Sequence, residues 1–194
     1  MSLPSEPVRS VLAPEAPEYS PDERRILLDL AHRSIESALL DQSTDTTPPS
    51  EHLARPRGAF TTLHLGGELR GCIGYVLPMA SLYQTVADTA RAAAFDDPRF
   101  QPVAVDEAPH LQIEISVLSI PQPIRPVDVI IGKHGLIITM GARRGLLLPQ
   151  VPVEWDWDRE TFLAQTCIKA GLPAGAWQRG AELLGFTAEV FGEE

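Results

Sequence analysis

An alternating segment followed by two glycines constrains the fold of this chain more than any other feature. From residue 59 to residue 65 the side chains alternate between two faces, with Leu63 and Leu65 on the apolar one. Gly66 and Gly67 come next, and glycine tolerates the positive φ angles of a tight hairpin turn. We therefore predict a β-hairpin whose return strand runs from residue 68 to about residue 76.

A helix and a further strand follow the hairpin, and this order is found twice. In the first set, residues 81–95 carry apolar side chains three or four positions apart, and residues 111–117 alternate. The second set comprises apolar segments 135–140 and 144–148 around a turn at Gly141, a helix over 159–170 and a final strand near 186–191. The pairs Arg70-Gly71 and Arg144-Gly145 occupy like places after their turns, which suggests an internal duplication.

The order of these elements favours an α+β fold. Long stretches contain no strand-helix-strand crossover, which argues against a parallel, doubly wound sheet. We predict antiparallel sheets with helices packed over them.

The N-terminal region divides into a tail, a helix and a connection. Residues 1–18 carry four prolines and little apolar surface, so we expect a disordered tail there and a single domain over residues 19–194. Ser20 can cap a helix, and Glu23 can reach back to complete a capping box. The helix should end near residue 40, and we expect residues 41–57 to form an exposed connection.

Charge and cysteine content limit the classes of function. The formal charge of -10 repels a phosphate backbone, which makes nucleic-acid binding unfavourable. No apolar run reaches the roughly 18 residues that span a membrane, and no secretion signal is evident, so we expect a cytoplasmic protein. Cys72 and Cys167 should then be free thiols, with Cys167 in the core on the apolar stripe of its helix.

Four short motifs, in order, resemble those of the AMMECR domain family: LRGCIG at 69–74, GKHGL at 132–136, GLLLPQ at 145–150 and TCIKAGL at 166–172. The resemblance covers roughly residues 20–192 and implies an α+β fold in two lobes. Members of the family are often encoded beside, or fused to, a Memo-like protein, and near radical-SAM proteins. The resemblance thus implies a Memo-like protein partner, and it implies no particular reaction.

Cys72 is the leading candidate for a functional residue. It lies between Gly71 and Gly74, where missing side chains let a ligand or another backbone come close. A nucleophilic cysteine needs a nearby cation or base, and Arg70 and His134 are the best suppliers in the sequence. The alternative is that Cys72 packs as a small apolar group.

The length of the hairpin turn decides which residues neighbour Cys72. A two-residue turn places Thr61 opposite Cys72, puts Arg70 on the face of Cys72 and directs His64 to the other face. A three-residue turn reverses that parity and places His64 across from Arg70. The sequence leaves both registers open.

Three further polar residues are candidates, each with a structural alternative. His134, flanked by glycines, is either a base or ligand contact or a side chain that bonds a loop carbonyl. Glu114 interrupts an apolar strand, so it lies on an exposed sheet face or lines a cleft as acid, base or partner of Arg70. Gln150 could orient a ligand or bond its own loop.

The sequence contains no metal-ligand spacing and no phosphate-binding glycine motif, so we predict no metal and no cofactor. Two hypotheses of function follow, with RNA binding ranked last. The first is thiol-dependent modification of a small-molecule ligand; the second is a noncatalytic module that binds a protein partner. In the first, the catalytic residues are Cys72, His134 and Glu114, and the binding residues are Arg70, Gly71, Gly74 and Gln150.

Overall fold

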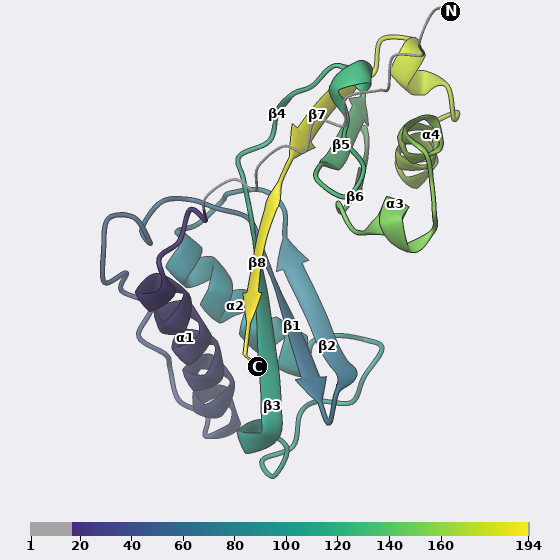
Figure 1. Ribbon diagram of the computed structural model, residues 1–194. Coiled ribbons are helices and arrows are strands. Elements are labelled where there is room, and N and C mark those ends of the chain that lie inside the picture. Colours follow the sequence, from purple (N-terminus) through teal and green to yellow (C-terminus); the bar gives the residue numbers. More distant parts are fainter. Residues whose placement is uncertain (1–16, 194) are drawn as a thin grey trace, which may run out of the picture.

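The computed structural model describes residues 17–193, which form an α+β fold in two lobes (Figure 1). The first lobe comprises residues 17–118 and 188–193, and the second comprises residues 119–187; each contains a four-stranded antiparallel sheet. The tail predicted over residues 1–18 lies outside the described residues except at its end. There, the amide of Glu18 donates to the Glu189 carboxylate at 2.6 Å.

The first lobe follows the predicted order of hairpin, helix and strand. Its sheet has the order β2-β1-β3-β8, and the two long helices lie on one face of it (Figure 1). The elements are α1 (Pro21–Leu39), β1 (Ala59–Leu65), β2 (Glu68–Tyr75), α2 (Leu82–Phe95), the 3₁₀ turn η1 (Ala108–His110), β3 (Leu111–Leu118) and β8 (Ala188–Gly192).

Both long helices begin where local chemistry favours a helix start. Ser20 caps α1, and the capping box with Glu23 is complete, as predicted. Ser81 caps α2, its side chain accepting from the amide of Gln84 at 3.1 Å. The apolar spacing predicted for residues 81–95 is confirmed, since Val86 of α2 is fully buried, and Leu30 of α1 is fully buried as well.

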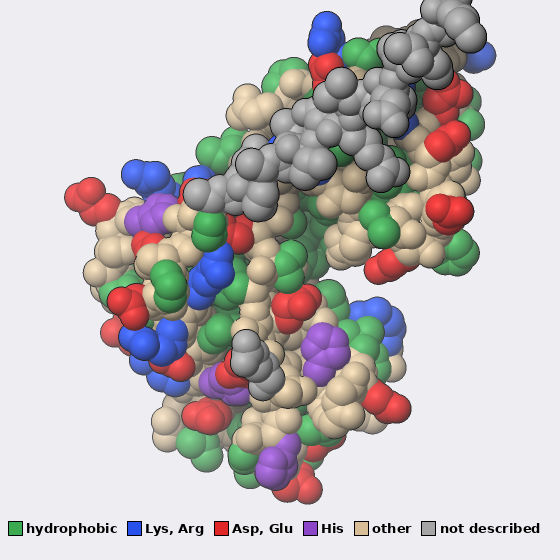
Figure 2. All heavy atoms as spheres, in the orientation of Figure 1, with side chains coloured by type: hydrophobic (Ala, Val, Ile, Leu, Met, Phe, Trp, Pro, Cys, Tyr) green, Lys and Arg blue, Asp and Glu red, His purple; other side chains and the backbone are tan. Residues whose placement is uncertain are grey.

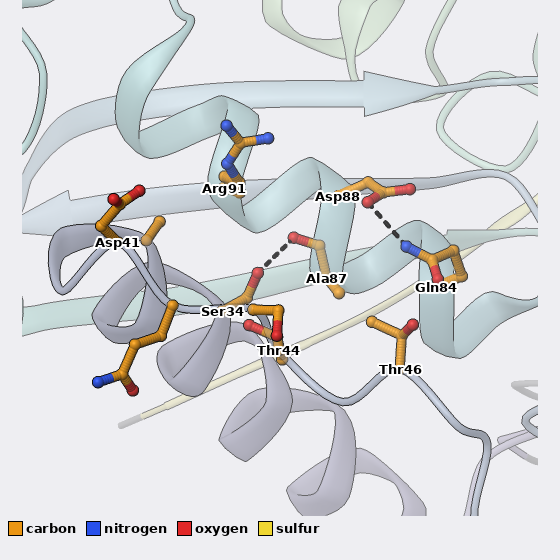
Figure 3. A pocket seen from close by; sticks show the side chains of 11 residues that line it. Ser34, Asp41, Thr44, Thr46, Gln84, Ala87, Asp88 and Arg91 are labelled. Carbon is orange, nitrogen blue, oxygen red and sulfur yellow. Dashed lines mark hydrogen bonds between the residues drawn. The ribbon is translucent and has the colours of Figure 1, made fainter.

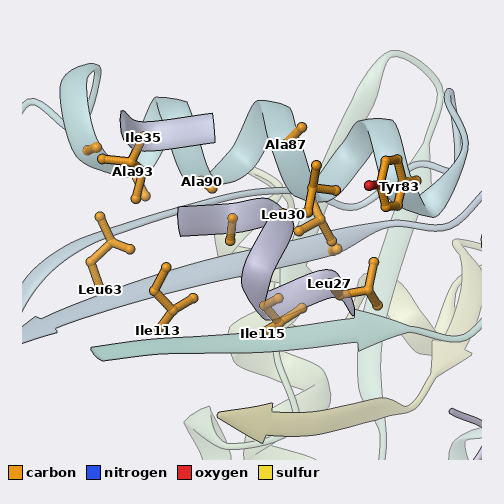
Figure 4. Close-up of a cluster of buried hydrophobic side chains, with 14 of the residues drawn as sticks. Leu27, Leu30, Ile35, Leu63, Tyr83, Ala87, Ala90, Ala93, Ile113 and Ile115 are labelled. Atoms are coloured by element: carbon orange, nitrogen blue, oxygen red, sulfur yellow. The ribbon is translucent and has the colours of Figure 1, made fainter. Parts of the chain in front are cut away.

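The core of the first lobe lies between the sheet and these helices (Figure 4). Every second residue of β1 and β3 points into it, including Leu63, Ile113 and Ile115, all of them buried. The residues in between, such as Phe60 and Glu114, are only half-buried and face away from α1 and α2. We call this second side of the first sheet the outer face.

The second lobe repeats the order of the first. Its sheet has the order β4-β7-β5-β6, so β6-β5-β7 corresponds to β2-β1-β3. The elements are β4 (Gln122–Pro123), η2 (Pro126–Asp128), β5 (Gly135–Met140), β6 (Arg143–Leu147), α3 (Val151–Glu154), α4 (Arg159–Lys169), η3 (Ala176–Gln178) and β7 (Glu182–Phe186). A common origin for the two halves stays a prediction.

The core of the second lobe lies under α4. Asp158 caps this helix by accepting from the amide of Thr161 at 2.8 Å. Phe162 and Leu163 of α4 pack with Leu136 of β5. Cys167 is fully buried in the same cluster, which confirms its predicted place in the core.

The end of the chain differs from the prediction. The single strand expected near residues 186–191 is in fact two strands, β7 and β8, which belong to different sheets. After β7 completes its pairing with β5, the chain crosses back to the first lobe and β8 pairs with β3. The second lobe is therefore an insertion between two neighbouring strands of the first sheet.

A third cluster of apolar side chains joins the two lobes. Leu118 at the end of β3 packs with Ile137 and Phe186 of the second sheet, and Phe60 of the outer face adds to this group. In the space-filling view the surface is hollowed beside this junction (Figure 2). The outer face thus runs toward the boundary between the lobes.

Candidate functional site

The register of the β1–β2 hairpin was not the one expected from its turn. The turn has two residues, but the pairing shifts by one position because Arg70 is an extra, unpaired residue. Such a β-bulge reverses the parity of every residue that follows it. Thr62, rather than Thr61, therefore lies opposite Cys72, and the expectation for a two-residue turn was wrong on this point.

The bulge brings polar side chains together on the outer face. Cys72, Thr62 and Glu114 are directly paired across β2, β1 and β3 and form one row. The Thr62 hydroxyl donates to the Cys72 Sγ at 3.4 Å, and the cysteine is only half-buried. His64 lies two residues from Thr62 on the same face, diagonal to Cys72 and within reach of a long side chain.

The backbone of Cys72 is held by Asp97 and Arg99, two side chains that were not among the candidates from the sequence. Since β2 is an edge strand, one side of its backbone has no neighbouring strand. The Cys72 amide donates to Asp97 Oδ2 at 2.9 Å, and the Cys72 carbonyl accepts from Arg99 Nη2 at 3.3 Å. Asp97 and Arg99 thus occupy the place of a missing strand.

Asp97 and Arg99 also bind each other. Arg99 donates to the Asp97 carboxylate through Nε at 3.0 Å and through Nη2 at 2.7 Å. These bonds, with that of the Cys72 amide, hold the pKa of Asp97 well below its usual range although its side chain is only 2% exposed. The bond to Asp97 likewise raises the pKa of Arg99. The pair therefore stays charged at neutral pH.

Arg70, the bulged residue, binds the segment that follows α2. Its guanidinium donates to both oxygens of Glu107, at 3.1 and 2.8 Å, and to the carbonyls of Gln101 and Pro102. The bond to Arg70 lowers the pKa of Glu107. Arg70 thus fixes residues 101–107 along the edge of β2.

Gly71 and Gly74 allow other parts of the protein to pack closely against β2. A Cβ at Gly71 would lie 2.1 Å from the carbonyl oxygen of Ala93, so α2 packs directly on this strand. A Cβ at Gly74 would lie 2.2 Å from the ring of Phe60. The close approach expected from these glycines therefore occurs, with a helix backbone and an aromatic ring as the neighbours.

The fold does not bring His134 into the row of Cys72. His134 lies just before β5 in the second lobe, where its Nδ1 accepts from the amide of Ile130 at 3.0 Å. It lines a pocket of about 170 Å³ with residues of β4 and β7. Gln150 is exposed at the start of α3, also in the second lobe. Of the three predicted catalytic residues, Cys72 and Glu114 share a site and His134 lies elsewhere.

An apolar cavity of about 540 Å³ lies at the end of β2, beginning two residues beyond Cys72. Its volume falls within the range of about 300–1,000 Å³ that is usual for small-molecule sites. The cavity is lined by Gly74, Tyr75, Val76, Leu77, Met79, Ala80, Thr85 and Asp88.

Within residues 17–193, no group of three or more His, Cys, Asp or Glu side chains is placed to hold a metal ion. None of the helices in this range has the length and apolar character needed to cross a membrane. On the face shown in Figure 2, Lys and Arg side chains are interspersed with Asp and Glu.

Comparison with known proteins gives a consistent assignment. A family model described as AMMECR1 matches residues 28–191. The chain is 45% identical over 184 residues to a protein of Thermococcus onnurineus, covering 87% of this chain and 89% of the relative. A protein of Methanosarcina acetivorans is 42% identical, covering 89% and 92% of the two chains. The crystal structure of an uncharacterized protein from Pyrococcus horikoshii superimposes with a TM-score of 0.75 at 42% identity, covering 87% and 90%.

Proposed function

This chain belongs to the AMMECR1 family, and we propose that it performs thiol-dependent chemistry on a small molecule, with Cys72 as the nucleophile. The observation that carries this proposal is the hydrogen bond from the Thr62 hydroxyl to the Cys72 sulfur on the outer face. A hydroxyl donor binds a negatively charged sulfur more strongly than a neutral thiol. The thiolate is the form of cysteine that attacks carbon.

The neighbouring side chains supply the other roles that the reaction needs. The His64 ring makes no hydrogen bond within residues 17–193, so it is available to take the thiol proton. The sulfur then forms a bond with an electrophilic carbon of the ligand, and the leaving group departs with the bonding pair and a proton from His64. Glu114, across from Thr62, lies where it can orient the ligand or the imidazole.

The test is selective alkylation of the folded chain. Iodoacetamide should modify Cys72 while Cys167, fully buried in the second core, stays unmodified, which mass spectrometry of tryptic peptides would show. Thr62→Val should slow the reaction of Cys72 at neutral pH, because the donor to sulfur is removed. His64→Gln should also slow that reaction, because the proposed acceptor of the thiol proton is removed.

A Cys72 as unreactive as Cys167 would overturn the proposal. So would a Thr62→Val variant whose Cys72 reacts at the rate of the unaltered protein. Cys72→Ser serves as the control that assigns the modified site.

As a second candidate function, the chain would act as a noncatalytic module that binds a protein partner. The proposed partner is a Memo-like protein. Exposed apolar side chains beside Gln150 favour it: Val153 is 58% exposed and Trp155 is 67% exposed. Aromatic residues at such positions are common anchors of interfaces. A pull-down with a purified Memo-like protein separates the two functions. Trp155→Ala should abolish capture if the module is the function, and Cys72→Ser should leave it unchanged.

A further inference from the structure

A polar cavity separate from the outer face lies between α1, the connection that follows it and α2 (Figure 3). Its volume is about 350 Å³, at the lower end of the range for small-molecule sites. None of the residues that line it belongs to β1, β2 or β3. Most of its lining side chains carry hydroxyl, amide or charged groups, which favours a polar ligand.

Three charged side chains line this cavity without neutralising one another. Asp41, Asp88 and Arg91 give a formal total of -1, and no ion pair joins any two of them within 4.0 Å in the described residues. The guanidinium of Arg91 makes no hydrogen bond within residues 17–193, which leaves its planar fork of donors for a carboxylate. A ligand with a net charge of +1 would balance the site.

The charges are spread along the cavity. Figure 3 shows Asp41 and Arg91 toward one end and Gln84 with Asp88 toward the other. Gln84 donates to Asp88 Oδ1 at 2.8 Å, which holds this carboxylate in place and leaves its second oxygen to accept another donor. Asp88 and Arg91 are three positions apart on α2, or about 4.5 Å along the helix axis, and Asp41 lies on the connection across from them. The site therefore suits a small ligand that carries an anionic group and cationic groups on a short chain.

We infer that this cavity binds a basic α-amino acid, such as L-lysine or L-arginine. Arg91 pairs with the ligand carboxylate, and Asp41 accepts from the α-ammonium beside it. The cationic end of the ligand side chain reaches Asp88. The hydroxyls of Thr44 and Thr46 in the connection flank the stem of the ligand.

The wall opposite the connection is fixed. Ser34 of α1 is buried and its hydroxyl donates to the carbonyl of Ala87 at 2.7 Å, which joins the two helices at the base of the cavity (Figure 3). This bond fixes α1 and α2 relative to each other, so the base of the cavity is formed before a ligand binds.

The test is calorimetric titration of the full chain with L-lysine and two matched analogues. L-Norleucine keeps the amino-acid head and lacks the terminal ammonium; cadaverine keeps both amines and lacks the carboxylate. L-Lysine should bind saturably at millimolar concentration, and each analogue should bind about tenfold more weakly or worse.

Variants show which group of the ligand each charged side chain binds. Arg91→Gln should weaken L-lysine about tenfold and leave cadaverine unchanged, and Asp88→Asn should weaken L-lysine and leave norleucine unchanged. Arg55→Gln and Asp29→Asn are matched controls, since both residues are exposed and lie outside the cavity. The inference is overturned if L-lysine gives no saturable heat, if norleucine binds as tightly as L-lysine, or if the control variants weaken binding as much as the cavity variants.

Discussion

The amide of Cys72 donates a hydrogen bond to the carboxylate of Asp97 at 2.9 Å, across 25 residues of sequence. Arg99 completes the contact by binding both the carboxylate and the Cys72 carbonyl. The open edge of the first sheet is therefore closed by an ion pair at the position of the candidate nucleophile. Asp97 and Arg99 therefore hold both the edge strand β2 and the thiol of Cys72 in position.

Replacement of Asp97 should destabilise the fold. Asp97→Asn keeps the shape of the side chain and removes the charge that binds Arg99, so we expect the free energy of unfolding to fall by about 1–3 kcal/mol. Urea denaturation measures this. Asp96→Asn is the matched control, because Asp96 is exposed and should change the unfolding free energy little. Equal effects of the two variants would contradict the assigned role of Asp97.

The contribution of Asp97 should depend on pH. The hydrogen bonds with Arg99 lower the pKa of Asp97 in the folded chain, whereas its pKa in the unfolded chain is about 3.9. The contribution is therefore fully present above the unfolded pKa and is lost as the pH falls below about 4 toward the folded value. The difference in urea midpoint between the parent and Asp97→Asn should shrink over that interval. A difference that is constant from pH 7 to strong acid would contradict this.

Gly71 should tolerate no side chain. An added Cβ would meet the carbonyl of Ala93 at 2.1 Å, and that atom is backbone, so α2 would have to move. We expect Gly71→Ala to cost about 1–3 kcal/mol or more of unfolding free energy. Gly175→Ala is the control, because its nearest atom would be 3.8 Å away and its φ is -91°. Thermal denaturation of the two variants compares them directly.

Replacement of Tyr19 by phenylalanine should not lower the free energy of unfolding. Its buried hydroxyl makes no well-aligned hydrogen bond within residues 17–193, although the Arg57 guanidinium lies near enough to offset part of the rise in pKa that burial causes. A buried hydroxyl without a partner costs about 1–3 kcal/mol. Tyr19→Phe should therefore leave the unfolding free energy unchanged or raise it. Tyr83→Phe, which removes the acceptor of an Arg33 donor at 3.0 Å, should lower it. Urea denaturation distinguishes the two, and a large loss in Tyr19→Phe would contradict the structure.

The same tyrosine should make the fold sensitive to alkali. Burial raises the pKa of Tyr19 to about 12, above the value of about 10 for an exposed phenol. The unfolded chain then loses this proton first, so stability is present below pH 10 and declines as the pH rises toward 12. Tyr19→Phe should lack this part of the decline. Unfolding midpoints measured from pH 9 to 12 test it.

Local features of the fold could be predicted from the sequence. The capping box at Ser20 and Glu23, the turn at Gly66 and Gly67 and the buried stripe of α4 each depend on neighbouring residues. The inward and outward faces of β3 followed from alternation, which put Glu114 on the side away from the helices.

Features that depend on distant contacts could not be predicted. The bulge at Arg70 is stabilised by Glu107, far along the chain, and no local pattern marks it. Asp97 and Arg99 lie in a loop without periodicity, so their bonds to Cys72 left no signal beyond the charges themselves. The division of residues 182–192 into two strands depends on which sheet each one joins.

The insertion of one lobe between β3 and β8 governs the order in which the protein can mature on the ribosome. Residues of the second lobe leave the exit tunnel before the strand that closes the first sheet, so the edge of β3 stays without a neighbour while they are made. Once β8 pairs with β3, Glu189 forms an ion pair with Arg24, and Glu193 contacts His32. These contacts connect the end of the sheet to α1. The first sheet therefore reaches its native topology only after β8 has been made and has met α1.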